Sequence, residues 1–294
     1  MTEKFKIYIN AIRPHHWIKN ILIFLPSLTS GIIDIEKSKL LLLAFLAFSF
    51  VASAGYLFND IKDKDTDKKN PYKKHRAIAS GALSIKGAVI LSVLLLIASL
   101  GIIISIGSTQ FAVTVAVYLL LTFTYSLYLK HMVVADIITL SLLYTLRVAA
   151  GALILSIDIS VWLLSFSILI FLSLATIKRI SELKALPLGQ EEIKVREYLF
   201  DDIIILETLS LVSGYISVVV LIFHFSIEAT QALYSQYEIL WLICPIILYW
   251  LTRVILITHR GEMHQDPIIF ALKDKISLYI TISIVFIVLL AKFL

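Results

Sequence analysis

Long apolar stretches limit what this chain can fold into more than any other feature of its sequence. Of its 294 residues, 59% are hydrophobic and the mean hydropathy is +0.92, whereas soluble domains are roughly half apolar. A helix of about 20 apolar residues crosses the hydrocarbon core of a bilayer, so each stretch of that length is a candidate membrane span. Nine such stretches lie near residues 18–35, 40–60, 85–106, 110–129, 133–156, 161–178, 206–226, 238–258 and 275–293. The sequence therefore predicts an all-α polytopic membrane protein, with nine transmembrane helices in a single domain that covers residues 1–294.

The basic residues are distributed unevenly between the two sides of this predicted membrane protein. If nine helices alternate in direction, 22 of the 26 Lys and Arg residues lie in segments on one side, and Lys37, Lys39 and Lys292 lie on the other. The positive-inside rule makes the basic side cytoplasmic. We therefore expect a cytoplasmic N-terminus, an interfacial segment 1–17, cytoplasmic loops 60–86, 178–205 and 259–274, and an outer C-terminus. Topology and phosphate binding explain the basic excess, which gives no support to nucleic-acid binding.

An acidic motif, NDIKDKDTD, follows directly on the second apolar stretch at Asn59–Asp67. If residues 40–66 stay helical, Asp60, Asp63 and Asp67 are spaced by three and four positions and share one face, while Asp65 points elsewhere. Carboxylates at the C-terminus of a helix work against its macrodipole, so a cation is needed to stabilise them. Mg²⁺ suits this site, because it takes one or two protein carboxylates and completes its coordination with water and phosphate oxygens.

Basic residues surround this acidic motif and allow two interpretations. The four lysines Lys62, Lys64, Lys68 and Lys69 are typical of a solvated loop with mixed charges. Beyond Pro71, which ends any helix, the residues Lys73, Lys74 and Arg76 instead favour a metal-bound diphosphate, since cations neutralise the oxygens that a metal does not reach.

The sequence here resembles the UbiA superfamily of membrane prenyltransferases. Asn59, Asp60, Asp63 and Asp67 match the family signature NDxxDxxxD, which stands at the cytoplasmic end of the second of nine helices. The stretch KKHRAIASG matches the basic, glycine-bearing segment that follows in the family, although Ala77 stands where a proline is common. The resemblance covers nearly the whole chain and implies a Mg²⁺-dependent membrane transferase with its active-site loops on the cytoplasmic side.

The second family signature is where the chain departs from the usual pattern. Members that use prenyl diphosphates carry a second acidic motif, DxxxD, after the sixth helix, but this chain has ATIKRISEL there, with Lys178, Arg179 and Glu182. Lysine and arginine can bind a phosphate without a metal. This substitution resembles the branch of phosphoribose-diphosphate:polyprenyl-phosphate phosphoribosyltransferases. The stretches RPHHWIKN, YSLYLKH, VADI, LRVAAGAL and DPIIFALKD are also similar to that branch.

The resemblance implies transfer of a 5-phosphoribosyl group from phosphoribosyl diphosphate to a polyprenyl phosphate lipid in a prokaryotic cell membrane. Asp60, Asp63 and Asp67 would bind Mg²⁺ and take part in catalysis, and Asp136 or Glu182 would stabilise the cationic ribose carbon or bind the ribose hydroxyls. The lipid phosphate is already ionised, so no general base is needed. The residues expected to bind substrate are Asn59, Arg13, Lys19, Lys73, Lys74, Arg76, Tyr125, Lys130, Arg147, Lys178, Arg179 and Glu182.

Two charged residues fall inside the fifth apolar stretch, where a charge at the bilayer centre costs about 2.5 to 3.5 kcal/mol or more. Asp136 and Arg147 are eleven positions apart, about three helical turns, so both should face the interior of the bundle. Arg147 is then either a substrate ligand or the structural partner of a carboxylate. Lys130, at the end of the fourth stretch, is either a phosphate ligand or a lysine that extends along the apolar surface to water.

Two other functions are compatible with part of the pattern. A prenyltransferase that moves a polyprenyl group from its diphosphate to an aromatic or other acceptor would keep the first motif, but it should also show the second acidic pair. A transporter of a phosphorylated metabolite would place its polar groups at the membrane midplane, whereas this chain gathers them at one face. The sequence alone gives no oligomeric state, lipid chain length or acceptor identity.

Overall fold

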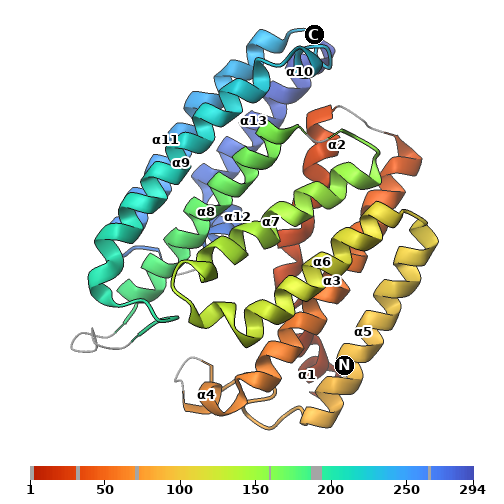
Figure 1. Ribbon diagram of the computed structural model, residues 1–294, viewed down its shortest axis with the longest axis vertical. Helices are drawn as coiled ribbons and strands as arrows, with labels where there is room; N and C mark the ends of the chain where they lie inside the picture. Colours follow the sequence, from red (N-terminus) through yellow and green to blue (C-terminus); the bar gives the residue numbers. More distant parts are fainter. Residues whose placement is uncertain (1–2, 31–33, 70–72, 159, 187–193, 264–265) are drawn as a thin grey trace. The chain divides into compact units, whose positions relative to one another are not determined.

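The computed structural model describes residues 3–30, 34–69, 73–158, 160–186, 194–263 and 266–294, and these residues form helices, turns and loops without a β-strand (Figure 1). Eight helices are long and apolar enough to cross a membrane, by length and composition. They are α3 (Ile35–Lys62), α5 (Ile85–Ile106), α6 (Thr109–Leu127), α7 (Ala135–Ile154), α8 (Val161–Lys184), α9 (Ile203–Phe225) with the 3₁₀ turn before it (Phe200–Phe225 in all), α11 (Ile243–His259) with the 3₁₀ segment before it (Tyr237–His259 in all), and α13 (Lys275–Phe293). The prediction of an all-α polytopic membrane protein is confirmed.

The first predicted span, residues 18–35, differs from a regular transmembrane helix. Within its described part, a 3₁₀-helix η1 (Pro14–Phe24) is followed by a short α2 (Leu25–Ser30), and residues 31–33 lie outside the description. Polar side chains of η1 bond to α3, because Trp17 Nε1 donates to Ser53 Oγ at 2.9 Å and Asn20 Nδ2 donates to Ser49 Oγ at 2.9 Å. Hydropathy indicates an apolar segment but not its helix type, so the described residues contain eight long spans instead of nine.

Local signals place several helix ends where the sequence predicts them. Helix α5 begins after Ser84, whose Oγ accepts a hydrogen bond from the backbone N–H of Gly87 at 3.1 Å, and it ends at Gly107, where φ is 71°. Glycine adopts this left-handed conformation without steric cost. At the other end of the chain, Asp274 caps α13 through the N–H of Ser277 at 2.8 Å.

The chain divides into two compact units. Unit 1 comprises Met1–Leu25, Asp34–Leu129 and Leu146–Ile157. It holds α1 (Glu3–Ile12), η1, α3, α4 (Lys64–Lys69), α5, α6 and the second half of α7, and α3 packs against α1, η1, α5 and α6. A buried cluster of Ala11, Leu57, Ile78, Leu83 and Ala88 anchors the loop after α4 to the end of α3.

Unit 2 comprises Pro26–Ile33, Lys130–Thr145 and Asp158–Leu294. Its long helices are α8, α9, α11 and α13, with α8 packed along α9. The short elements are η2 (Leu129–His131), η3 (Phe200–Asp202), α10 (Glu228–Gln231), η4 (Tyr237–Leu242) and α12 (Pro267–Lys273). One buried cluster contains Ile137, Ala175, Ile180, Leu183, Tyr198, Ile203 and Leu206, and it lies beside the polar residues at the end of α8.

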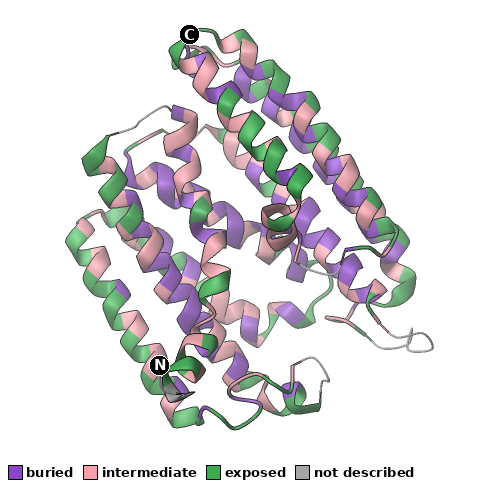
Figure 2. Cartoon of the chain, turned by 180° about the vertical axis from the view of Figure 1, so that it is seen from behind, coloured by how far each residue is buried: buried purple, intermediate pink, exposed green. Residues whose placement is uncertain are grey.

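Exposed apolar surface is the other sign of a membrane protein. Helix α5 buries only Ala88 and Ser99, and it exposes Ile90, Leu94, Ile97 and Ile104 (Figure 2). A helix that is apolar all round but largely uncovered by protein is expected to face lipid. We therefore describe this surface as lipid-facing.

Candidate active site

The carboxylates of the acidic motif lie where α3 passes into α4. The backbone N–H groups of Asp63 and Asp67 each bond to the carbonyl four residues earlier at 2.8 Å, so helical spacing continues through the junction although α3 ends at Lys62. Asp60 and Asp67 are buried, with 5% and 2% of their surface exposed, and Asp65 is exposed. The exposure of Asp65 differs from the burial of Asp60 and Asp67, as the prediction of a different helix face requires.

Two arginines stabilise the buried carboxylates. Arg76 Nη1 lies 3.1 Å from Asp60 Oδ1 and 2.7 Å from Asp67 Oδ2, so one nitrogen bridges both residues. Arg13 Nη2 donates to both oxygens of Asp60, at 2.7 and 2.6 Å. Buried charges need such partners, because removal of one would leave the other uncompensated away from water.

The other predicted residues of this region lie around that pair. Asn59 Nδ2 donates to Asp63 Oδ2 at 3.0 Å, and Asp63 is half-buried. Lys73 is half-buried and Lys74 is exposed, whereas residues 70–72 of the same loop lie outside the description. Asp63 therefore contacts Asn59, while Arg76 bridges Asp60 and Asp67.

The donors of this region suit Mg²⁺ by their chemistry. The described residues contain no group of three or more His, Cys, Asp or Glu side chains that could hold a metal ion, so the predicted set of Asp60, Asp63 and Asp67 is not assembled as three ligands. Asp60 and Asp67 do converge on one cationic nitrogen. Mg²⁺ needs only one or two protein carboxylates, so this buried pair fits it if Arg76 gives up its place.

A second set of polar contacts in unit 1 is centred on Arg147 and includes Asn20 of η1. Arg147 on α7 donates from Nε to Asn20 Oδ1 at 2.7 Å and from Nη2 to the hydroxyl of Tyr118 at 2.8 Å. Its guanidinium also lies over the Tyr118 ring, 4.8 Å from the ring centroid. Arg147 and Lys19 are both buried, as an inward-facing position requires. Asn20 and Tyr118 were not predicted, although a polar residue inside an apolar stretch is a recognisable signal.

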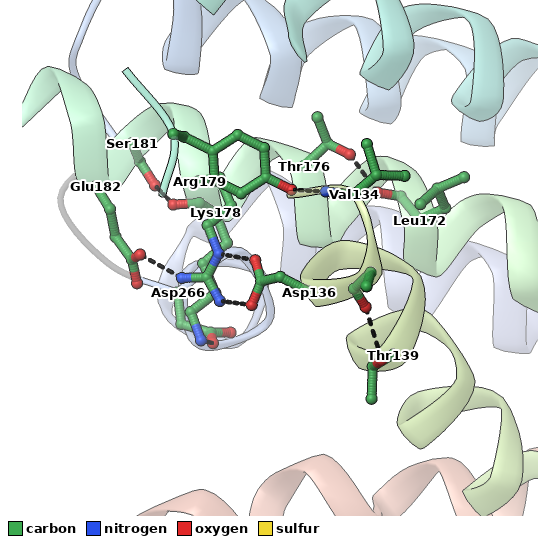
Figure 3. A network of polar contacts seen from close by, with 12 residues as sticks. Val134, Asp136, Thr139, Leu172, Thr176, Lys178, Arg179, Ser181, Glu182 and Asp266 are labelled. Carbon is green, nitrogen blue, oxygen red and sulfur yellow. Dashed lines mark hydrogen bonds and ion pairs between the residues drawn. The ribbon is translucent and has the colours of Figure 1, made fainter. Parts of the chain in front are cut away.

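In unit 2 the second cluster gathers at the end of α8 (Figure 3). Arg179 binds Asp136 through Nε at 2.5 Å and Nη2 at 2.9 Å, and its Nη1 contacts Glu182. Lys178 Nζ lies 3.4 Å from Asp266 Oδ2. Each of these three carboxylates therefore contacts a basic side chain of α8.

The position of these residues corrects the predicted boundary of the 178–205 loop. Helix α8 continues to Lys184, so Lys178, Arg179 and Glu182 lie on helical turns instead of in a loop. The sequence has no glycine or proline between residue 178 and Pro187, and Arg179 and Glu182 form a pair three positions apart that supports a helix. Residues 187–193 of the predicted loop lie outside the description.

Burial distinguishes the two basic residues of α8. The side chain of Arg179 is 2% exposed and Asp136 is fully buried, whereas the side chains of Lys178 and Glu182 are 27% and 38% exposed. Tyr198 supports this cluster by accepting a hydrogen bond at its hydroxyl from the N–H of Val134 at 2.9 Å, and burial raises the pKa of the Tyr198 hydroxyl. Lys178 and Glu182 are thus the more accessible members of the cluster.

The two residues predicted at the end of the fourth span are also described. Tyr125 is half-buried near the end of α6. Lys130 lies in η2 with only 1% of its surface exposed, so it does not extend to water as a snorkelling lysine does. The interpretation of Lys130 as an interfacial anchor is therefore wrong.

Comparisons with known proteins agree with this architecture. The model of the UbiA prenyltransferase family matches residues 23–273. An uncharacterized protein, y4nM, of Sinorhizobium fredii is 34% identical over 279 residues, which are 94% of this chain and 54% of that protein, so the chain spans about half of its length. The nodulation protein NoeC of Azorhizobium caulinodans is 34% identical over 93% of this chain and 89% of its own length.

Two further similarities concern function and fold. The decaprenyl-phosphate phosphoribosyltransferase of Corynebacterium glutamicum is 34% identical over 179 residues, which cover 60% of this chain and 54% of that protein. The structure of a UbiA homolog from Archaeoglobus fulgidus bound to GPP and Mg²⁺ covers 98% of this chain and 100% of its own, with a TM-score of 0.71 at 15% identity. At this identity the structural similarity shows the fold.

Proposed function

Because the chain belongs to the UbiA prenyltransferase family and is thus a membrane-embedded transferase, we propose that it transfers a 5-phosphoribosyl group from phosphoribosyl diphosphate to a polyprenyl phosphate lipid. The observation that carries this proposal is the cluster at the end of α8. Where prenyl-diphosphate-using members have a second acidic pair, this chain has Lys178 and Arg179, and both already contact carboxylates. The similarity of this chain to the decaprenyl-phosphate phosphoribosyltransferase of Corynebacterium glutamicum, which is 34% identical over 60% of this chain, supports the proposal of these substrates.

The carboxylates and arginines of unit 1 would bind the diphosphate of the sugar donor. Asp60 and Asp67 would hold Mg²⁺, which on binding neutralises negative charge on the leaving diphosphate. Arg76 and Arg13, freed from the carboxylates, would turn their guanidinium groups to the diphosphate oxygens that remain exposed. Asn59 and Asp63 bond to each other at the end of α3, Lys73 and Lys74 precede Arg76 in the chain, and these four residues would complete the site.

The chemical step needs no proton transfer. The bond between the anomeric carbon and the diphosphate oxygen breaks, and diphosphate leaves with the electron pair. An ionised oxygen of the lipid phosphate forms the new bond to that carbon, so charge and atoms balance without a general base.

The carboxylates of unit 2 have different accessibilities and thus different proposed roles. Asp136 is fully buried against Arg179, so we assign it the positioning of that arginine. Glu182 is 38% exposed, so it is the carboxylate of this cluster that a substrate can reach.

The decisive experiment uses the purified protein in lipid nanodiscs with Mg²⁺. One reaction receives phosphoribosyl diphosphate and polyprenyl phosphate, and a second receives a prenyl diphosphate and 4-hydroxybenzoate. We expect a lipid that carries phosphoribose, and we expect its formation to stop in EDTA and to fall at least a hundredfold in Asp60→Asn. A prenylated aromatic product without phosphoribosyl transfer would instead identify an ordinary prenyltransferase.

We further propose that the chain lies in a prokaryotic cell membrane with its N-terminus and active site on the cytoplasmic side. The charge distribution supports this orientation, because most of the basic residues lie on the predicted cytoplasmic side, as do Asp60 and Asp67 at the end of α3 and in α4.

A further inference from the structure

Beside Lys178, unit 2 contains a small, partly open depression, and the space of about 200 Å³ between its atoms includes open solvent. Apart from Lys178 and Asp266 its lining is largely apolar and comes from α7, α8 and α12: Leu140, Tyr144, Leu174, Ala175, Pro267 and Ile268. Ligand sites commonly combine such an apolar lining with a few polar groups that fix orientation. The Lys178–Asp266 pair is that polar group here.

We propose that this depression binds the phosphate and the first isoprenyl unit of the polyprenyl phosphate, with Lys178 exchanging Asp266 for the lipid phosphate. This inference rests on the proposed function, because it assigns one of its two substrates to a site. A polyprenyl phosphate carries an anion directly on a branched hydrocarbon, which matches a cation beside an apolar lining. Phosphoribosyl diphosphate is polar throughout, so it gains nothing from the apolar lining.

The charges explain why an exchange is needed. Lys178 and Arg179 contact three carboxylates, those of Asp136, Glu182 and Asp266, so the charge of Lys178 is engaged by Asp266. When Asp266 withdraws, a phosphate can approach Lys178 without facing this carboxylate. The Lys178–Asp266 contact is the longest of these ion pairs, at 3.4 Å, and the lysine side chain is 27% exposed.

The geometry makes Lys178 the side chain that can exchange partners. Arg179 is held by both oxygens of Asp136 and by Glu182, so its charge is committed within the protein. Asp266 also caps α12, with Oδ1 accepting from the N–H of Ile268 at 3.1 Å, so it can withdraw from Lys178 and still retain a hydrogen bond. An exchange therefore replaces the Lys178–Asp266 contact and leaves the contacts of Arg179 with Asp136 and Glu182 in place.

The proposal is tested by direct binding in nanodiscs, with decaprenyl phosphate and decaprenol as probes. Lys178→Gln should weaken binding of decaprenyl phosphate about tenfold and leave decaprenol unchanged, whereas Asp266→Asn should tighten phosphate-lipid binding several-fold. Lys184→Gln is the matched control, because Lys184 is a lysine of the same helix that contacts Glu207 and the carbonyl of His259. Equal lipid affinities in Lys178→Gln and Lys184→Gln would overturn the proposal.

A second pair of variants tests the apolar lining. Ile268→Trp should fill the depression and weaken binding of both probes, while the neighbouring Ile269→Trp on α12, which does not line it, should not. Kinetics then separate the substrates: Lys178→Gln should raise KM for the lipid and change KM for phosphoribosyl diphosphate by less than twofold. A raised KM for the sugar donor alone would place Lys178 in the donor site. If no phosphoribosyl transfer occurs in any protein, the proposed function fails, and the binding measurements still decide whether this site takes a phosphate lipid.

Discussion

A single guanidinium nitrogen stands where the proposed metal would bind. Arg76 Nη1 contacts Asp60 and Asp67, both of which are buried. A metal ion and this nitrogen need the same carboxylate oxygens, so they compete. In the absence of substrate, Arg76 therefore acts as an internal cation that, together with Arg13 on Asp60, balances the charge of the two carboxylates.

This competition predicts that loss of Arg76 strengthens metal binding. Arg76→Gln should raise the affinity for Mn²⁺, a spectroscopic substitute for Mg²⁺, in the absence of substrate, because the metal no longer competes with the Arg76 guanidinium. The expected increase is about tenfold, which corresponds to about 1.4 kcal/mol of binding free energy. Electron paramagnetic resonance measures free Mn²⁺ directly. Arg260→Gln, a change at an exposed arginine, controls for the general loss of positive charge. Weaker Mn²⁺ binding in Arg76→Gln would instead mean that Arg76 organises the ligands.

The partners of the acidic motif differ in how well the sequence could predict them. Arg76 follows the motif closely, so its contact with Asp60 and Asp67 was within reach of a local argument. Arg13 is 47 positions from Asp60, and its contact depends on how η1 lies along α3. Likewise, composition could not show that Arg179 is buried between Asp136 and Glu182, because that depends on the packing of α7 against α8.

The helices were predicted best where short-range signals coincide with hydropathy. The ends of α5 coincide with the predicted 85–106, and those of α13 with 275–293, because Ser84, Gly107 and Asp274 provide caps at these ends. The prediction of a regular helix for the first span was wrong. Trp17 and Asn20 bond to serines of α3, so these tertiary contacts fix the conformation of η1. Helix α8 extends beyond the predicted 161–178 to Lys184, because Arg179 and Glu182 pair three positions apart and support further helical turns.

The link between α11 and α13 predicts a pH effect on stability. Asp274 contacts Arg253 of α11 at 2.7 and 2.9 Å and caps α13. Burial alone would raise the pKa of Asp274, but hydrogen bonds from Arg253 and Ser277 outweigh it and lower the pKa below the ordinary value of 3.8. A carboxylate with a lowered pKa stabilises the fold above its unfolded-state pKa, and this stabilisation is lost as the pH falls through the lower, folded-state pKa.

Asp274→Asn should therefore destabilise the protein by about 1.5 to 3 kcal/mol near pH 7, the usual range for hydrogen bonds to charged groups. The difference from the unchanged protein should shrink below about pH 4, as Asp274 takes up a proton. Thermal unfolding in detergent, followed by intrinsic fluorescence across pH, measures this. Glu262→Gln, at an exposed carboxylate, is the control. A difference in stability that stays constant down to pH 3 would contradict this prediction, because it would show that the charge of the Asp274 carboxylate does not stabilise the fold.

For the molecule as a whole, the exposed apolar surface and the distribution of basic residues both fit a membrane protein. Helix α5 exposes a continuous apolar surface, as a lipid-facing helix must, while Lys and Arg residues gather in the segments predicted to be cytoplasmic. Hydropathy alone gives the spans but not the direction of the chain, so the orientation rests on the positive-inside rule. Because Asp60 and Asp67 lie at one end of α3, that orientation also decides which side of the membrane supplies the sugar donor.

Two serines near opposite ends of α3 provide a matched test of this orientation. Ser38 lies in the first turn of α3 and Ser80 in the loop after α4, and both are exposed. In a Cys244→Ser background, which removes the only native thiol, Ser38→Cys should react with a membrane-impermeant maleimide in intact cells. Ser80→Cys should react only after the membrane is permeabilised, because positive-inside topology places residues 60–86 in the cytoplasm. The reverse pattern would place the carboxylates outside the cell and overturn the proposed orientation.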